Sequence, residues 1–292
     1  MQRLWWIALV LAGCSGAEEL DPDISSDAGT PPADAPVIEP DAPVTPARGI
    51  SIVFDYRFDD AAFFTPSRRL VLEAAAQHWN NLLVDDFPPI PLGTDIRTRD
   101  PETPTAAAMS FPSTVAIDDV MIFVGCAAID GPGGTLATSN HSAAINTVTD
   151  ATLRELLRSR YEGMDFQPWT GWISFDCGED WFFDPTPATV TDLPANRPDF
   201  LSTANHELGH VLGFGTAMAY FAHVSNTTFV GTKTVATYGG PVPLIASNTH
   251  FASGLSSGGR EPLLDPSRPG GVRSTATPID VAVLEDLGYA PR

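Results

Sequence analysis

The pattern of apolar and polar positions becomes that of a folded protein only from residue 49 onward. In this part of the chain, segments of strand-like alternation or short apolar runs are interleaved with segments of helical spacing. Strands are predicted at 50–58, 120–125 and 172–175, and helices after Thr65 and at 150–161. A long loop-rich stretch follows. This order predicts one domain with a mixed α/β (α+β) sheet lobe and a smaller irregular C-terminal lobe.

The first fourteen residues have a different pattern, in which Arg3 precedes eight apolar residues and a few small residues that end at Cys14. Such a run is too short to span a bilayer and fits a secretory signal. Residues 11–14, Leu-Ala-Gly-Cys, resemble a bacterial lipobox. The resemblance implies a signal peptide at 1–13, a lipid anchor on Cys14 and, because Ser15 follows, an outer-membrane location. The alternative is an ordinary signal peptide that happens to contain a cysteine.

Residues 14–48 are predicted to be a solvated linker behind the lipidated cysteine. Between 15 and 48 the chain has seven prolines, six alanines and five aspartates and no aromatic residue to bury. We assign the remainder, 49–292, to one domain, because no break in composition divides it.

Charge excludes one class of function. The chain has 36 acidic and 16 basic residues, a net charge of −20 and a sequence pI near 4.4. A phosphate backbone would be repelled, so we expect no nucleic-acid partner. We expect a monomer whose only contact with a membrane is its lipid anchor.

Two cysteines remain beyond the lipobox, and each follows a predicted strand. Cys126 comes after the run at 120–125, and Cys177 comes after the run at 172–175. An exported chain meets an oxidising compartment, so we expect a disulfide between them. The alternative is two buried thiols.

The candidate chemistry is concentrated in a His-Glu-x-x-His motif at residues 206–210. Histidines at i and i+4 project from one face of a helix, so His206 and His210 can bind one Zn²⁺. Glu207 lies beside them, where its carboxylate can take a proton from zinc-bound water. Gly213 permits a left-handed helix stop and a sharp turn. The alternative is an ordinary buried helix with two hydrogen-bonded histidines.

These residues resemble the signature of the metzincin zinc endopeptidases, His-Glu-x-x-His-x-x-Gly-x-x-His or Asp. The chain departs from it because Thr216 occupies the position of the third ligand, and a hydroxyl is a poor zinc ligand. In the leishmanolysin-like branch, an insertion follows the glycine and a later histidine completes the site. The resemblance implies His250 as that histidine. His223 remains the main alternative, and His141 is expected across the cleft, where it would contact substrate.

The resemblance extends over residues 49–290, including 52–55, 172–176 and 277–289. It implies a twisted mixed sheet, an active-site helix and an irregular C-terminal lobe. It also places Leu264 where metzincins carry a methionine beneath the zinc.

The function implied is zinc-dependent endopeptidase activity on protein or peptide substrates, at the cell surface or in the periplasm. The resemblance places the substrate antiparallel to an edge strand, for which Gly134–Ser139 is the best match; a glycine-rich turn is the alternative for that segment. Two other functions stay open: an inactive metzincin-fold binding module, and a zinc hydrolase that acts on peptidoglycan. Acidic loops such as 176–184 leave an additional calcium site open.

Overall fold

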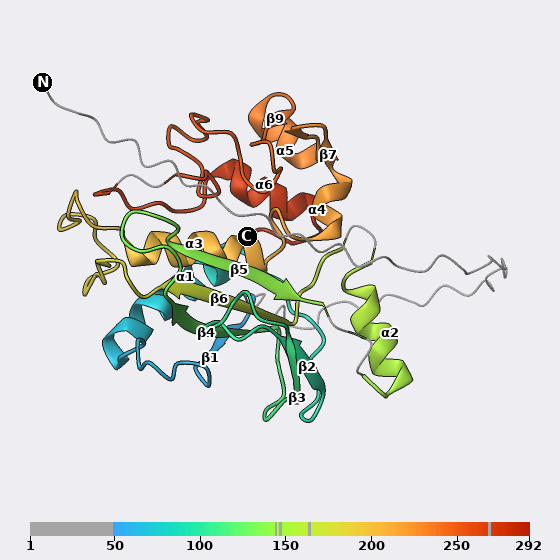
Figure 1. Cartoon of the computed structure of the whole chain (residues 1–292). Coiled ribbons are helices and arrows are strands. Elements are labelled where there is room, and N and C mark those ends of the chain that lie inside the picture. The colour runs from blue at the N-terminus through green and yellow to red at the C-terminus, as the bar shows by residue number, and fades with distance from the viewer. Residues whose placement is uncertain (1–48, 144, 146–147, 163–164, 268–269) are drawn as a thin grey trace, which may run out of the picture.

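In the computed structural model, four strands form the central sheet in the order β1-β4-β6-β5 (Figure 1). Strands β1 (Ile52–Asp55), β4 (Val120–Ala127) and β6 (Thr170–Asp176) are parallel to one another. Strand β5 (Ala137–Ser142) runs antiparallel to β6 at the edge. The sheet is therefore mixed, and with its helices it confirms the predicted α/β (α+β) class.

The structure describes residues 49–292 except 144, 146–147, 163–164 and 268–269. The predicted signal peptide, Cys14 and the linker lie outside the described residues. Within the described residues, no helix has the length and apolar character needed to cross a membrane.

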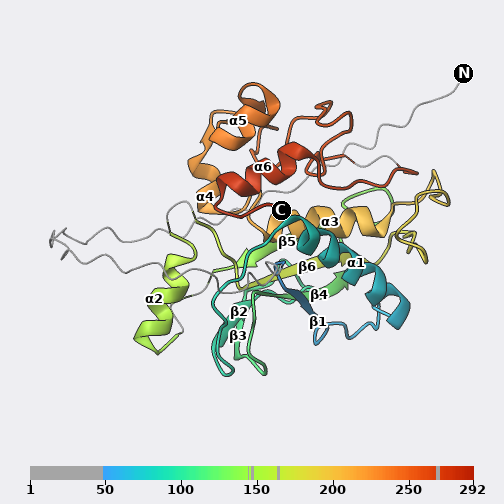
Figure 2. The same cartoon turned by 180° about the vertical axis from the view of Figure 1, so that it is seen from behind.

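Two helices cover one face of the sheet (Figures 1 and 2). Helix α1 (Pro66–Leu82) begins after Thr65, as predicted, and packs against α3 (Phe200–Val211). Helix α2 (Ala151–Ser159) corresponds to the helix predicted at 150–161 and lies apart, near the end of β5. The structure thus places the helix with the His-Glu-x-x-His motif next to the edge strand of the sheet.

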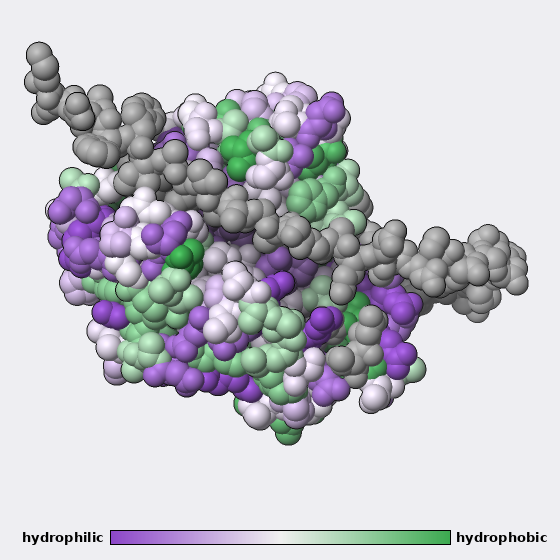
Figure 3. Space-filling model, in the orientation of Figure 1, coloured by the Kyte–Doolittle hydropathy of each residue, from purple (hydrophilic) through white to green (hydrophobic). Residues whose placement is uncertain are grey.

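The remaining elements are short. A hairpin of β2 (Asp95–Thr98) and β3 (Met109–Pro112), which the sequence analysis did not predict, extends the sheet lobe. The C-terminal lobe consists of α4 (Met218–Ala222), β7 (Val224–Ser225), β8 (Thr228–Phe229), α5 (Thr232–Tyr238), β9 (Val242–Pro243) and α6 (Pro278–Asp286). Apolar and polar residues intermingle on the face seen in Figure 3.

The strand predicted at 50–58 is shorter than expected. Pairing with β4 ends at Asp55, and a turn follows in which the backbone N–H of Asp59 donates to the carbonyl of Tyr56 (3.0 Å). By contrast, β4 is buried on both faces, which explains its uninterrupted apolar run.

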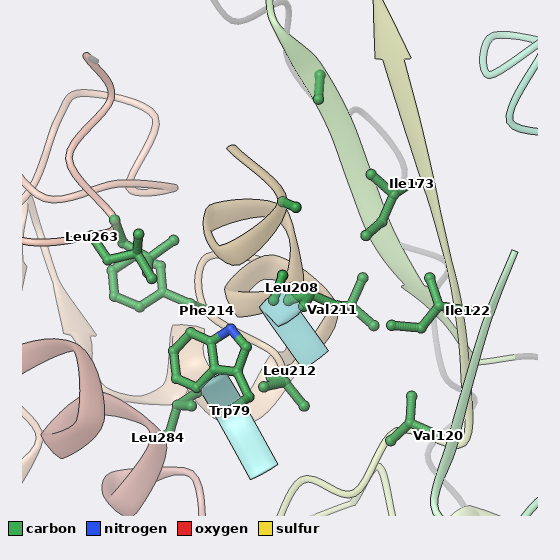
Figure 4. Packing of buried hydrophobic residues seen from close by; sticks show 14 of the residues in the cluster. Trp79, Val120, Ile122, Ile173, Leu208, Val211, Leu212, Phe214, Leu263 and Leu284 are labelled. Atoms are coloured by element: carbon green, nitrogen blue, oxygen red, sulfur yellow. The ribbon is translucent and has the colours of Figure 1, made fainter. Parts of the chain in front are cut away.

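A buried hydrophobic core fixes the motif helix against its neighbours (Figure 4). Trp79 of α1 is completely buried near Leu212 and Leu284, and its indole N–H donates to the carbonyl of Asn205, 3.1 Å away. Val211 faces Ile173 and the sheet. The helix is therefore held on one side by α1 and on the other by the sheet.

The predicted disulfide is confirmed. Cys126 lies near the end of β4 and Cys177 directly follows β6, and these strands are hydrogen-bonded neighbours. The two sulfur atoms are 2.05 Å apart and the Cα atoms 5.2 Å apart, within the usual range for a disulfide.

We expect His78 to make the stability of the protein pH-dependent. Burial, helped by the positive charge of Arg260, lowers the pKa of His78 from 6.5 to about 4, and its neutral Nε2 accepts the N–H of Ala276 (3.2 Å). The unfolded chain therefore takes up this proton before the folded chain does. Stability that is fully present above pH 6.5 is lost as the pH falls toward 4.

Denaturant unfolding of metal-free protein at pH 7, 5.5 and 4 measures this effect. The variant His78→Gln keeps an acceptor but cannot titrate, so it should lose less stability than the wild type over this range. An identical loss in both proteins would contradict the assignment.

Candidate metal centre

The local sequence determines where the motif helix begins and ends. Asp199 caps its N-terminus by accepting the backbone N–H of Ser202 (3.1 Å), and its carboxylate is also paired with Arg273 (2.6 Å). Arg273 bonds Asp184 as well, so a buried ionic group anchors the start of α3. At the other end, Gly213 has a φ of +109°, the left-handed stop that the sequence predicted.

Three histidines meet beside this helix. The Nε2 atoms of His206 and His210 are 3.1 Å apart, and each lies 3.0 Å from Nε2 of His250. All three side chains are buried. The three rings thus form a group that could hold a metal ion.

His250 reaches this group because its segment is tied to two others. The backbone N–H of Ile245 donates to the carbonyl of His250 (3.1 Å), and the N–H of Phe251 donates to the carbonyl of Leu264 (3.1 Å). These bonds bring His250 back beside α3, forty positions after His210 in the sequence.

The other candidates for the third ligand lie elsewhere. His223 donates from Nε2 to the carbonyl of Asp286 (3.1 Å). The hydroxyl of Thr216 donates to the carbonyl of His210 (2.6 Å), and Nδ1 of His141 lies 3.4 Å from that hydroxyl. Burial lowers the pKa of His141 to about 4, so its ring is neutral near pH 7. The structure therefore does not bring these residues into the three-histidine group.

The hydrogen bonds of the rings prepare their Nε2 atoms to bind a cation. Nδ1 of His206 lies 2.8 Å from the carbonyl of Leu263, and Nδ1 of His210 lies 2.8 Å from that of Phe214. A carbonyl can only accept, so Nδ1 carries the hydrogen and Nε2 presents a lone pair. Nδ1 of His250 is 3.0 Å from the Thr249 hydroxyl. Partners of this kind orient metal-binding histidines.

The spacing of the nitrogens also fits a metal ion. Two imidazole nitrogens bound to one ion at about 2.0–2.1 Å with tetrahedral angles lie roughly 3.3–3.4 Å apart. The observed separations of 3.0–3.1 Å are close to this value. The Nε2 lone pairs of His206 and His210 point at each other and would repel one another without a cation, so the donor set favours an ion between them.

A tight turn at 262–265 contacts the motif helix and one of the three histidines. Leu264 packs against Gly209 of α3 so closely that a Cβ at Gly209 would lie 3.0 Å from a methyl group of Leu264. The turn also supplies the Leu263 carbonyl that orients His206. Leu264 itself is buried.

Asp280 holds this turn, a role that the sequence analysis did not identify. Its carboxylate accepts the backbone N–H groups of Leu263 and Leu264, both at 2.9 Å, and also caps α6 through Thr277. Burial raises the pKa of Asp280 above its usual value. The only signal in the sequence is the Thr-x-x-Asp capping box, which predicts a helix start but not a contact with the turn.

Glu207 lies on α3 next to His206 and is 5% exposed. Its backbone carbonyl accepts the hydroxyl of Ser139 (3.0 Å), which ties the middle of β5 to the helix. Among the strands that the structure describes, β5 pairs only with β6. The glutamate is therefore close to a sheet edge that has one side open to further pairing.

The edge strand is shifted relative to the segment 134–139 expected from the sequence. Gly131 and Gly133 have positive φ, and the N–H of Gly134 donates to the carbonyl of Gly131 (3.1 Å), so this part is a turn. Regular pairing begins at Ala137 and continues to Ser142. The glycine-rich turn and the edge strand, which were alternatives for this segment, are thus both present, and the turn precedes the strand.

The acidic loop at 176–184 does not gather its carboxylates into a ligand set among the described residues. Asp176 instead accepts backbone N–H groups of Gly131 and Gly178, and Asp184 is paired with Arg273. Elsewhere, Asp119 lies near two other acids, but it accepts the backbone N–H groups of Ser51 and Phe87.

Comparison of the chain with family models and with curated proteins finds no match. The interpretation of the site therefore rests on its own geometry and on the motif.

Proposed function

We propose that this chain is a zinc-dependent endopeptidase with a metzincin-like fold of the leishmanolysin-like branch. The observation that carries the proposal is the convergence of three Nε2 atoms from His206, His210 and His250, with Glu207 next to them on the same helix. Zinc is favoured because a site of three neutral imidazoles suits it and because catalytic zinc sites have three protein ligands.

The chain's own residues supply binding and proton transfer. Bound zinc would supply Lewis-acid chemistry, polarising a scissile carbonyl and making a water more acidic. The carboxylate of Glu207 accepts a proton from the attacking water and returns it to the leaving amine. The burial of the site excludes bulk water, which strengthens each of these electrostatic effects.

The edge strand β5 provides the means of holding a peptide. An extended substrate could add to its outer side, antiparallel to β5, through main-chain hydrogen bonds. Ser139 at the middle of β5 is bonded to the carbonyl of Glu207, so a peptide on this edge would pass close to the glutamate.

Digestion assays separate this function from its two alternatives. The purified protein should digest denatured casein and leave purified cell wall intact. Digestion of cell wall alone would favour a peptidoglycan hydrolase. No digestion of either by protein that contains zinc would favour an inactive binding module.

We also propose that the protein is exported and anchored to the outer membrane through Cys14. We expect Cys14→Ser to release the protein from the membrane fraction without changing the activity of the domain at 49–292, because the two are separated by the linker. Fractionation and immunoblotting measure this, with Ser15→Ala as a control that keeps the cysteine and should stay in the membrane fraction. A Cys14→Ser variant that remains membrane-bound would contradict the lipid anchor.

A further inference from the structure

The third histidine of the group differs from the other two in what holds its ring. His206 and His210 belong to one helix, and the Nδ1 atom of each faces a backbone carbonyl. His250 lies in a loop, and its Nδ1 faces the side-chain hydroxyl of Thr249, 3.0 Å away. Its orientation therefore depends on a side chain and on the placement of a loop.

Backbone hydrogen bonds close this loop at residues 244–251. Leu244 and Phe251 form an antiparallel bridge, and the N–H of Asn248 donates to the carbonyl of Ile245 (2.9 Å). Asn248 turns the chain with a φ of +60°. These bonds determine the shape of the loop, but none of them joins it to α3.

The turn that follows α3 supplies a contact with the loop. Gly215 has a φ of +68°, and a Cβ at this position would overlap the carbonyl oxygen of Thr249 and lie 2.8 Å from its Cα. Only glycine leaves room for two backbones to approach so closely. Phe214 of the same turn supplies the carbonyl that orients His210. One turn thus contacts the second histidine through a hydrogen bond and the loop of the third through its backbone.

The hydroxyl of Thr249 can complete the orientation of His250. Its Oγ1 lies 3.0 Å from Nδ1 of His250 and 2.8 Å from Oγ of Ser247, which is exposed. A ring that binds a metal through Nε2 carries its hydrogen on Nδ1, so the hydroxyl accepts this hydrogen and can donate its own to Ser247. Without the hydroxyl, the N–H of a buried ring would lose its acceptor.

We propose that Gly215 and Thr249 are positioning residues for the third metal ligand. Gly215 receives the backbone of Thr249, and the Thr249 hydroxyl accepts the Nδ1–H of His250 and so directs Nε2 toward the other two histidines. The inference rests on the metal-binding part of the proposed function and does not depend on peptide hydrolysis.

Substitution of Thr249 tests the hydroxyl. The zinc affinity of the full-length protein, measured by competition with a chelator, should fall roughly 10–100-fold in Thr249→Val, the usual effect of removing such a partner. Thr249→Ser keeps the hydroxyl and should restore most of the affinity. Thr228→Val is the matched control, because the Thr228 hydroxyl makes a bond of 2.8 Å to the carbonyl of Ser225 and not to a histidine; its zinc affinity should equal that of the wild type.

Proton NMR of the zinc-loaded protein reports on the hydrogen bond itself. A ring N–H that is held by an acceptor is protected from exchange with water and gives a signal. The wild type should show a protected Nδ1–H for each of the three histidines, and Thr249→Val should lose only that of His250. A residue that merely stabilised the fold would not have this selective effect.

Gly215→Ala tests the backbone contact. The added methyl group would displace the Thr249 segment, so zinc affinity should fall at least tenfold. Gly239→Ala is the matched control, because Gly239 also has a positive φ (+92°) but a Cβ there would meet nothing within 4 Å. It introduces a similar backbone strain and should keep the zinc affinity of the wild type.

Zinc affinity near that of the wild type in either Thr249→Val or Gly215→Ala would overturn the inference and leave the proposed function standing. An equal loss in Thr249→Val and Thr249→Ser, or in Gly215→Ala and Gly239→Ala, would also overturn it. Failure of the wild-type protein to bind zinc would overturn the proposed function and the inference together.

Discussion

Glu207→Gln is expected to keep a full complement of metal and to lose peptidase activity by roughly 10²–10⁴-fold, the contribution of a well-placed general base. Glutamine has the shape of glutamate but cannot accept the proton of the attacking water. The substitution leaves all three imidazoles in place, and their Nδ1 bonds go to Leu263, Phe214 and Thr249 and so do not involve the glutamate. This variant should therefore keep its metal and lose its activity.

Metal analysis and casein digestion of the same preparation measure both quantities. Glu155→Gln is the matched control, because Glu155 is a glutamate on helix α2 whose side chain is 72% exposed; it should retain both metal and activity. Activity of Glu207→Gln near that of the wild type would contradict the role of the carboxylate.

His250→Ala is expected to lose the metal and the activity together. The three Nε2 atoms are separated by 3.0–3.1 Å, so the removal of one leaves two ligands where a zinc site needs at least three. His223→Ala is the matched control. Its imidazole bonds the carbonyl of Asp286 in the C-terminal lobe, so its loss should leave metal binding intact.

Zinc stoichiometry and casein digestion of the two variants decide between the histidines. If His250→Ala kept metal and activity while His223→Ala lost both, the assignment of the third ligand would be wrong. The resemblance to the leishmanolysin-like branch would then lose its main support.

The local sequence pattern was enough to predict those elements that are buried along their whole length or whose ends are marked by a particular residue. Strands β4 and β6 were predicted because both faces are buried, which leaves an uninterrupted apolar run. The end of α3 was predicted because Gly213 can adopt a positive φ. The disulfide was predicted because each cysteine follows one of two strands, and these proved to be neighbours.

Features that depend on contacts between distant segments were not determined by local pattern. The sequence alone left His223 open as a third ligand. The backbone bonds from Ile245 to His250 and from Phe251 to Leu264 show how the segment of His250 returns to α3. The contact of Asp280 with the turn at 263–264 joins residues sixteen and seventeen positions apart, and a capping box does not indicate it.

The hairpin of β2 and β3 illustrates a different limit. Its two strands have four residues each. Strand β2 alternates, but over too few residues to stand out, and β3 is mostly exposed and has no alternation. The sequence pattern therefore gave no indication of the hairpin.

The most direct test of the account is the zinc content and peptidase activity of purified residues 49–292, measured before chelation, after chelation and after zinc is restored. This segment includes all the residues that form the buried core and the three-histidine group. The account predicts about one zinc ion per chain, casein digestion that is lost on chelation, and recovery when zinc returns. Folded protein that digests casein equally well after its metal has been removed would contradict it.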